Sequence, residues 1–220
     1  MDKIVIIGSS GHARVVIDIV EQAGHYQIVG LIDRFRPVGS QTLGYAVLGG
    51  EEVLPQLQVK HRLSGLIVAI GDNFIRGQVA AGVRARYPDL PLCSAIHPSA
   101  VIAPSATIGA GSVVMAGATV NPCCTVGELC ILNTQSSLDH DSTLTDCASL
   151  APRATTGGNC HIGAYSAISI AATLIHGINI GEHSVVGAGA TVLKSLPAFS
   201  IAYGSPARLI RSRTAGEKYL

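Results

Sequence analysis

A histidine flanked by two aspartates is the clearest set of chemically active side chains in this 220-residue sequence. Asp139, His140 and Asp141 follow one another in a region where titratable residues are otherwise scarce. An imidazole with an ordinary pKa of about 6.5 can take up a proton near neutral pH, and an adjacent carboxylate holds one tautomer and makes the ring more basic. The triplet is therefore a candidate site for proton transfer. The alternative is a surface histidine with an acidic neighbour by chance.

A second group of polar residues lies near the N-terminus, where Gly8-Ser9-Ser10-Gly11-His12 follows the apolar run 3–7. Free amides at the start of a helix suit a phosphate, and Asp33, about twenty residues past the loop, can accept a hydrogen bond from a ribose or a base. The run lacks the complete G-x-G-x-x-G pattern, so an NAD-dependent enzyme is a weaker interpretation. A second alternative is that Gly8 and Gly11 only form a tight turn from strand to helix, without a ligand. We expect a nucleotide here.

The elements around this loop alternate between strand and helix. Apolar β-branched runs predict strands over 3–7, 28–32, 45–48 and 66–70, and helical periodicity predicts helices through 12–24, 51–57 and 74–87. Such an alternation favours a small, Rossmann-like parallel α/β sheet. Ligands of these sheets bind beyond the carboxyl ends of the strands, where the loops at 8–12, 33–34 and 71–73 would meet.

The region 96–192 follows a different rule, because it repeats every six residues. From Ile96 to Val192 every sixth residue is aliphatic except Thr156. A second column, which runs every six residues from Ala100 to Ala190, is small except at Ile178. Neither a helix nor a flat strand has this period, whereas a parallel β-helix does, with one short strand and one corner per hexad. Three hexads make one coil of about 18 residues. A solenoid that serves only as a scaffold or an ice-binding surface is the alternative.

The length of the coil relates His140 to two later residues. Gly158 and His176 follow at intervals of 18, so they would occupy the same column in the next two coils. At about 4.8 Å per coil the two histidines would lie about 10 Å apart and could not touch. Gly158 would leave an open trough beside His140, with backbone amides available to a ligand. Nothing else in the spacing of His161, His176 and His183 singles them out.

These patterns divide the chain into an α/β domain over 1–90, a β-helix over 91–195 and a C-terminal cap over 196–220. The net charge of +1 does not indicate nucleic acid or a membrane surface, and the absence of a long apolar run or leader predicts a cytoplasmic protein. The basic residues of the cap could meet the phosphates of a coenzyme. We expect neither a metal nor a disulfide, because the six cysteines either fill the small-residue column or lack paired spacing.

Four motifs together resemble the nucleotide-sugar N-acetyltransferases related to the sialic acid O-acetyltransferases. They are Gly8-Ser9-Ser10-Gly11-His12, the run 69–76, Leu132-Asn133-Thr134 followed by Asp139-His140-Asp141, and Gly204-Ser205-Pro206-Ala207. The order of these motifs matches across essentially the whole chain. The family includes enzymes that acetylate UDP-linked 4-amino-4,6-dideoxy sugars and GDP-perosamine. The resemblance implies a left-handed β-helix.

The resemblance also implies roles for individual residues. His140 would be the base and Asp141 the acid that orients it. The nucleotide-sugar site would fall on Ser10, Gly11, His12, Asp33, Arg34 and Gly71. Acetyl-CoA, a co-substrate, would contact mainly backbone around Gly158, Ile170 and Ala188. Ser149 stands where some members have a second histidine near the acetyl group, which leaves the contact to the acetyl carbonyl open between a hydroxyl and a backbone amide.

The predicted function is direct acetyl transfer from acetyl-CoA to an amine on a nucleotide-linked sugar, for the biosynthesis of a surface polysaccharide or glycan. One alternative is O-acetylation of a sialic acid or a related sugar, since the same base would serve a hydroxyl. An alternative of another class is a non-catalytic protein that binds nucleotide sugars. A prism with three flat faces also predicts a homotrimer, with no nucleic acid or membrane partner.

Overall fold

A computed structural model describes residues 1–219 of the chain; Leu220, the last residue of the expected cap, lies outside the described residues. The chain forms two compact units, one of Met1–Gly71 with Ile75–Pro98 and one of Asp72–Phe74 with the chain from Ser99 onward. The first unit continues past residue 90 because the strand β6 (Ala95–Ile96) packs on α1 (Gly11–Ala23). The cap is part of the second unit, since its strands extend the coil.

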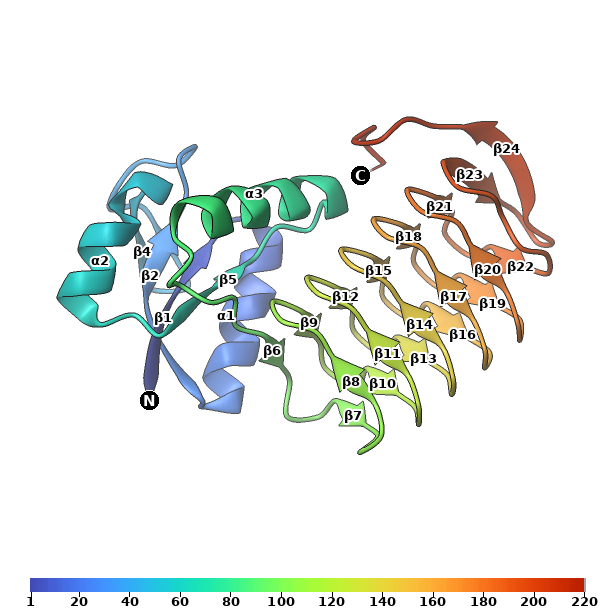
Figure 1. Cartoon of the computed structure of the whole chain (residues 1–220), viewed down its shortest axis with the longest axis horizontal. Helices are drawn as coiled ribbons and strands as arrows, with labels where there is room; N and C mark the ends of the chain where they lie inside the picture. The colour runs from blue at the N-terminus through green and yellow to red at the C-terminus, as the bar shows by residue number, and fades with distance from the viewer. Residues whose placement is uncertain (220) are drawn as a thin grey trace. The chain divides into compact units, whose positions relative to one another are not determined.

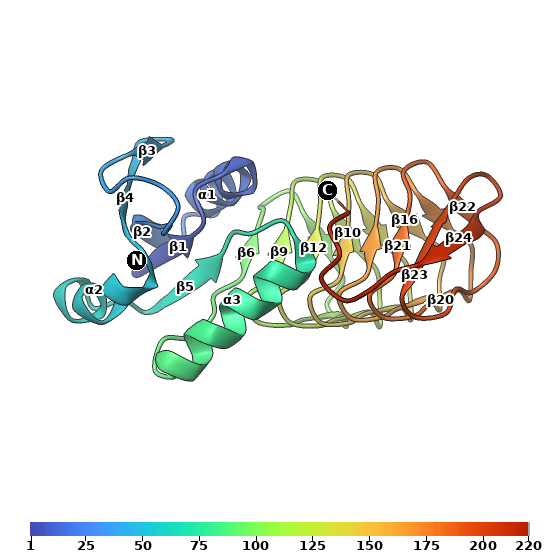
Figure 2. The same cartoon turned by 90° about the horizontal axis from the view of Figure 1, so that it is seen from above.

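The first unit is built on a five-stranded sheet in the order β3-β4-β2-β1-β5. Figure 1 labels the strands β4, β2, β1 and β5 of this sheet. The strands are β1 (Asp2–Ile7), β2 (Tyr26–Ile32), β3 (Gln41–Thr42), β4 (Tyr45–Gly49) and β5 (Gly65–Val68). The helices are α1, η1 (Glu51–Val53), α2 (Leu54–His61) and α3 (Asn73–Arg86). Figure 2 shows α1 on one side of this sheet and α2 with α3 on the other. Because both faces are covered, the central strands are continuous apolar runs rather than alternating ones.

The predicted parallel sheet is confirmed, with local differences at its edge. The short strand β3 pairs antiparallel with β4, a hairpin that hydrophobic periodicity did not indicate because β3 has only two residues. The predicted helix over 51–57 splits into the 3-10 turn η1 and the helix α2, with Pro55 in the first turn of α2, where its missing N–H costs nothing. α1 ends at Gly24, whose φ of 67° lies in the left-handed region.

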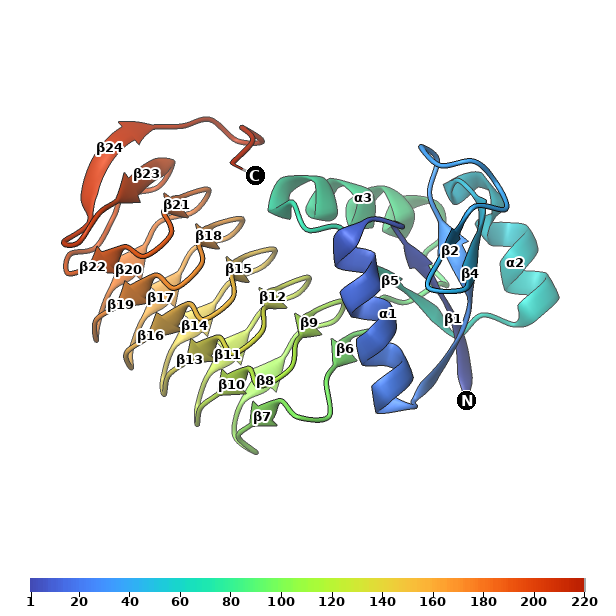
Figure 3. The same ribbon diagram turned by 180° about the vertical axis from the view of Figure 1, so that it is seen from behind.

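The second unit is the predicted left-handed parallel β-helix, and its strands recur with the six-residue period (Figures 1 and 3). They are β7 (Val101–Ile102), β8 (Thr107–Ile108), β9 (Val113–Val114), β10 (Thr119–Val120), β11 (Thr125–Val126), β12 (Ile131–Leu132), β13 (Ser137–Leu138), β14 (Thr143–Leu144), β15 (Ser149–Leu150), β16 (Thr155–Thr156), β17 (His161–Ile162), β18 (Ala167–Ile168), β19 (Thr173–Leu174), β20 (Asn179–Ile180), β21 (Val185–Val186) and β22 (Thr191–Val192). Each strand pairs with those three places away, giving the faces β22-β19-β16-β13-β10-β7, β20-β17-β14-β11-β8 and β21-β18-β15-β12-β9.

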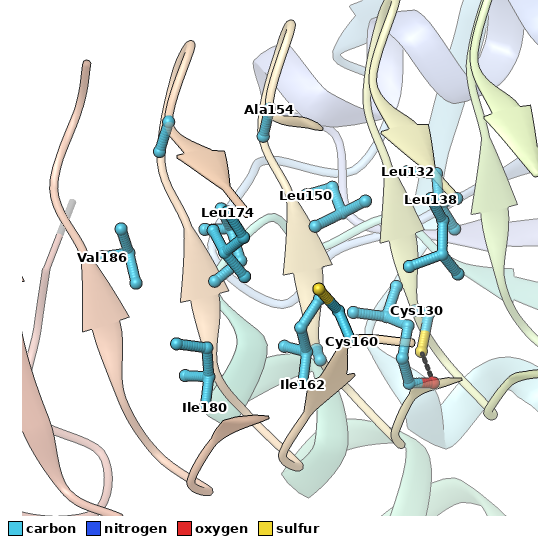
Figure 4. Close-up of a cluster of buried hydrophobic side chains, with 14 of the residues drawn as sticks. Cys130, Leu132, Leu138, Leu150, Ala154, Cys160, Ile162, Leu174, Ile180 and Val186 are labelled. Carbon is cyan, nitrogen blue, oxygen red and sulfur yellow. Dashed lines mark hydrogen bonds between the residues drawn. The ribbon is translucent and has the colours of Figure 1, made fainter. Parts of the chain in front are cut away.

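The interior of the coil is filled by the aliphatic column. Figure 4 shows these side chains pointing inward from all three faces, together with the small residues of the second column. Leu138, Leu150 and Ile168 are fully buried, and the thiols of Cys130 and Cys160 are buried fillers among them. Burial of one such aliphatic side chain contributes about 1.5–3 kcal/mol. The aliphatic column therefore sets the register of the strands and is the main stabilising feature of the coil.

The corners of the coil depend on left-handed backbone conformations. From Gly111 to Gly189 every sixth residue has a positive φ, including Cys123, Leu129 and Asp141, the last with a φ of 57°. Asp and Asn adopt this conformation more readily than other residues with a Cβ. The corner after β13 is thus a place where an aspartate fits the backbone and also lies beside His140.

The hairpin of β23 (Ser200–Tyr203) and β24 (Arg208–Ser212) ends the coil by continuing the face of β21. Because β24 is antiparallel to β23, the last parallel edge is covered rather than left open. None of the six cysteines forms a disulfide within the described part of the chain. No helix among residues 1–219 is long and apolar enough to cross a membrane.

Candidate functional site

The imidazole of His140 and the carboxylate of Asp141 form a hydrogen-bonded pair at the corner between β13 and β14. Nδ1 of His140 lies 2.8 Å from Oδ2 of Asp141. This hydrogen bond raises the pKa of His140 above its ordinary value, with a further contribution from the charge of Asp139. When neutral, the ring carries its proton on Nδ1, facing the carboxylate, so Nε2 has the free lone pair. The pair can therefore accept a proton at Nε2.

Asp139 fixes the backbone on which His140 stands. Its Oδ1 accepts the Nδ2–H of Asn121 at 2.6 Å and the backbone N–H of His140 at 2.9 Å. These two bonds lower the pKa of Asp139, and the charges of His140 and His176 lower it further. The carboxylate is thus ionised at neutral pH and adds negative potential beside the imidazole.

Thr156, the one polar residue of the aliphatic column, lies in the coil next to Asp139. Its hydroxyl accepts the backbone N–H of Asp139 at 3.0 Å, where elsewhere in the coil a backbone carbonyl takes this bond. The strands β13 and β16 accordingly share one residue pair, whereas the other neighbouring strands of the coil share two. Sequence reasoning gave Thr156 no role, although its interruption of the column was a usable signal.

The space beside His140 is not the open trough expected at Gly158. A Cβ built on Gly158 would lie 2.4 Å from Nε2 and 2.5 Å from Cε1 of His140, and Gly158 is buried. The imidazole therefore fills the place of the missing side chain. The expected separation of the histidines was also wrong, since the ring centroids of His140 and His176 are 6.2 Å apart. The estimate from strand spacing treated the side chains as parallel, whereas the two rings approach each other across the glycine.

The other two histidines do not join this site. His161 is exposed on β17. His183 is stacked between Tyr165 and Phe199, with ring centroids 4.7 and 5.1 Å away. Burial in this stack lowers the pKa of His183, and the charge of Arg213 lowers it further. His183 is therefore a structural residue of the coil.

The residues expected near acetyl-CoA lie on the coil in two settings. Ile170 and Ala188 are exposed at equivalent corners one coil apart, and in the described part of the chain their backbone N–H groups donate to no protein acceptor. The hydroxyl of Ser149 accepts a hydrogen bond from Nδ2 of Asn73 at 3.0 Å. Asn73, which is 1% exposed, also donates to the carbonyl of Ser166, so it anchors the start of α3 rather than a ligand loop.

The first unit contains a pocket of about 630 Å³ at the carboxyl ends of its strands. Four of the expected nucleotide-site residues line it: Ser10, Asp33, Arg34 and Gly71. The carboxylate of Asp33 is held by the hydroxyl of Ser9 at 2.5 Å and by the backbone N–H of Phe35 at 2.9 Å. Each carboxylate oxygen keeps a lone pair for a ligand hydroxyl or base N–H.

Gly11 and His12 are not among the residues that line the pocket. Nε2 of His12 is buried, with no hydrogen-bond partner in the described chain. Burial lowers the pKa of His12 to about 4, and the charge of the fully buried Arg76 adds to this effect. The guanidinium of Arg76 donates to the carbonyls of Ile70 and Gly71, each at 3.0 Å. Arg76 thus holds one wall of the pocket, a role that the sequence motif did not reveal.

No cluster of three or more metal-ligating side chains exists among the described residues. The arrangement at His140 provides a proton acceptor, a charged orienting partner and exposed backbone donors along the coil. These groups suit transfer of an acyl group to an amine or hydroxyl, which needs deprotonation of the acceptor and stabilisation of an oxyanion.

Known proteins resemble this chain in both of its units. Residues 3–83 match the family described as the PglD N-terminal domain. A single-residue mutant of perosamine N-acetyltransferase from Caulobacter crescentus, solved in complex with CoA and GDP-perosamine, is 36% identical with a TM-score of 0.90, over 96% of this chain and 98% of that one. The acetyltransferase domain of PglB from Neisseria gonorrhoeae is 30% identical with a TM-score of 0.87, over 96% of this chain and 100% of that domain.

Matches to curated sequences are shorter. Proteins of Staphylococcus aureus whose names assign them provisionally to the acetyltransferases are 39% identical over 54 residues. This match spans 27% of their length and 24% of the present chain.

Proposed function

Because this chain belongs to the nucleotide-sugar N-acetyltransferases with hexapeptide repeats, we propose that it transfers an acetyl group from acetyl-CoA to the amine of a nucleotide-linked 4-amino-4,6-dideoxy sugar. The observation that carries the proposal is the pairing of His140 Nδ1 with Asp141 at 2.8 Å, which leaves Nε2 as the proton acceptor. GDP-perosamine or a UDP-linked sugar is the proposed acceptor. The relative from Caulobacter crescentus was solved with the first of these.

The proposed reaction is direct transfer without an acyl-enzyme. A sugar amine attacks the carbonyl carbon of the thioester, and Nε2 of His140 takes the proton that the nitrogen loses. The C–N bond forms while the carbonyl electrons move to oxygen, and collapse of this intermediate breaks the C–S bond. The protonated His140 then returns its proton to the coenzyme thiolate. General base catalysis of this kind contributes about 100- to 10,000-fold in rate.

The two substrates are assigned to different units. The nucleotide sugar would occupy the 630 Å³ pocket, with Asp33 accepting a hydrogen bond from a ribose hydroxyl or base N–H and the amide of Ser10 facing phosphate. Gly11, the next residue along the chain, would add its amide from beside the pocket lining. Gly71 would shape the wall of this pocket, and His12, whose Cβ lies 3.9 Å from the place of a Cβ on Gly71, would support that wall from outside the pocket. Arg34, whose side chain is 58% exposed, would balance phosphate charge at the rim. Acetyl-CoA would run along the coil at Gly158, Ile170 and Ala188. The Ser149 hydroxyl accepts from Asn73 and keeps its own O–H, which would be available to donate to the acetyl carbonyl.

The proposal includes a homotrimer in the cytoplasm that serves surface polysaccharide or glycan biosynthesis. Three prisms packed about a threefold axis would form grooves between neighbours, with His140 facing the coenzyme groove. Light scattering tests this assembly, since a stable and active monomer of 22.6 kDa would contradict it.

The activity is tested by thiol release from acetyl-CoA with a panel of UDP-, GDP- and dTDP-linked 4-amino-4,6-dideoxy sugars. The expected result is turnover with at least one amino sugar and none with its 4-hydroxy counterpart. Turnover only with sialic acid would replace N-acetylation by O-acetylation. Binding of a nucleotide sugar without any thiol release would make the protein a non-catalytic binder.

A further inference from the structure

The reactive edge of His140 faces the next coil of the β-helix. Nδ1 is engaged by Asp141, so Nε2 is the atom that accepts a proton. The position of a Cβ on Gly158 would be nearest to Nε2 at 2.4 Å and Cε1 at 2.5 Å, with Cδ2 at 2.9 Å. The Nε2 edge of the ring therefore points along the column of residues spaced by 18, past Gly158. The next residue of this column, one coil beyond Gly158, is His176.

His176 is placed to meet whatever binds at Nε2. It is exposed, and its ring centroid lies 6.2 Å from that of His140 with the ring planes inclined by 47°. Gly158 has no side chain to separate the two rings. The carboxylate of Asp139 acts on both rings, because its pKa is lowered by the charges of His140 and of His176. The two imidazoles and this carboxylate thus form one polar cluster.

We infer that His176 is a second catalytic residue, whose imidazole N–H donates a hydrogen bond to the carbonyl oxygen of the acetyl thioester as negative charge develops there. This inference rests on the proposed acetyl transfer. An amine that gives its proton to Nε2 lies about 3 Å from that atom. The carbonyl carbon it attacks lies about 3–3.5 Å further on. A reacting carbonyl on the Gly158 side of His140 is therefore within reach of the neighbouring ring.

The step balances without a further reactant. The amine nitrogen forms a bond to the carbonyl carbon, the carbonyl electrons move to oxygen, and the proton of the amine goes to Nε2 of His140. His176 donates a hydrogen bond to that oxygen and keeps its proton. The carbonyl reforms as the C–S bond breaks, and the proton passes from His140 to the departing thiolate. Loss of one such oxyanion donor typically lowers kcat by about 100- to 1000-fold.

Two substitutions separate this role from packing. His176→Leu removes the donor, and we expect kcat to fall by about 100-fold or more while KM for the nucleotide sugar changes less than about threefold. His176→Gln keeps an N–H donor, and we expect its kcat to exceed that of His176→Leu by at least about tenfold. His161→Gln, a change at an exposed histidine on the neighbouring face, is the matched control and should keep wild-type turnover.

The outcomes distinguish this inference from the proposed function. If the wild-type protein acetylates no amino sugar, the proposed function itself is contradicted. Active wild-type protein with equal kcat in His176→Leu and His176→Gln would overturn the donor role and leave the function standing. A change confined to KM for the sugar would also overturn it, because it would make His176 a binding residue of the ground state. Circular dichroism and light scattering on each variant show whether the coil and assembly are retained.

Discussion

The imidazole of His140 occupies the volume that a side chain at position 158 would need. A Cβ on Gly158 would approach Nε2 to 2.4 Å, closer than any stable contact between a carbon and a ring nitrogen. The obstruction is a side chain and not backbone, so the ring would have to rotate to make room. Glycine at this position therefore sets the orientation of the proton acceptor.

We predict that Gly158→Ala displaces the ring of His140 and lowers kcat by about 10- to 100-fold, because a shift of about 1 Å in a catalytic group has effects of this size. The methyl group should also cost stability, measured by thermal unfolding. The matched control is the same substitution in a His140→Ala background, where the ring is gone and the methyl group fits. An equal loss of stability in both backgrounds would place the clash elsewhere.

His140→Asn should keep the fold and the binding of both substrates but lose the proton acceptor. Turnover is expected to fall by at least about 100-fold, while the dissociation constants of acetyl-CoA and the nucleotide sugar stay within about threefold. Steady-state kinetics and calorimetric titration measure the two effects separately. Near wild-type turnover with an intact fold would mean that another group takes the proton.

Asp141→Asn should cost less turnover than His140→Asn and should change the pH profile. The carboxylate stabilises the protonated ring and raises the pKa of His140, so its removal lowers that pKa. The protonated ring is inactive as a base, and activity rises with pH as the ring loses its proton. The acidic limb of kcat/KM should therefore move to lower pH in Asp141→Asn, and stay in place in Asp89→Asn, an exposed charge in the first unit.

Asp33→Ala should weaken binding of the nucleotide sugar and leave binding of acetyl-CoA unchanged. Asp33 lines the pocket and accepts from Ser9 and Phe35, so its loss removes a ligand acceptor and loosens the loop after β2. We expect KM for the nucleotide sugar to rise by about tenfold or more. Asp18→Asn, an exposed change on α1, is the control. A selective loss of acetyl-CoA binding in Asp33→Ala would reverse the assignment of substrates to the two units.

His12 should make the first unit sensitive to acid. Its folded pKa of about 4 lies below the ordinary value of about 6.5, so the unfolded chain takes up a proton that the folded chain does not. Stability is fully retained above about pH 6.5 and falls as the pH drops toward 4, by up to about 3 kcal/mol. Denaturant unfolding between pH 7 and 4 should show a smaller loss in His12→Gln. His25→Gln, at an exposed histidine, should follow the wild type.

The sequence by itself determined the architecture of the coil, because a six-residue period is incompatible with a helix or a flat strand. The buried residues Leu138, Leu150 and Ile168 all follow this period, and the observed strands recur with the predicted register. The pairing of His140 with Asp141 was also accessible, since the two residues are adjacent and share one corner. Local contacts and strict repeats are the relationships that a linear chain displays directly.

The tertiary structure alone decided which side chains from different coils meet, and how closely. Spacing by 18 residues placed Gly158 and His176 in the column of His140. The direction of the side chains was not visible in that spacing: the ring of His140 fills the space beside Gly158, and the rings of His140 and His176 lie close together. The hydroxyl of Thr156 accepts the backbone N–H of Asp139 in place of a backbone carbonyl, a contact between coils that the order of the residues does not display. Side-chain direction depends on volume and hydrogen bonding in the adjacent coil, and those neighbours are defined by packing rather than by order along the chain.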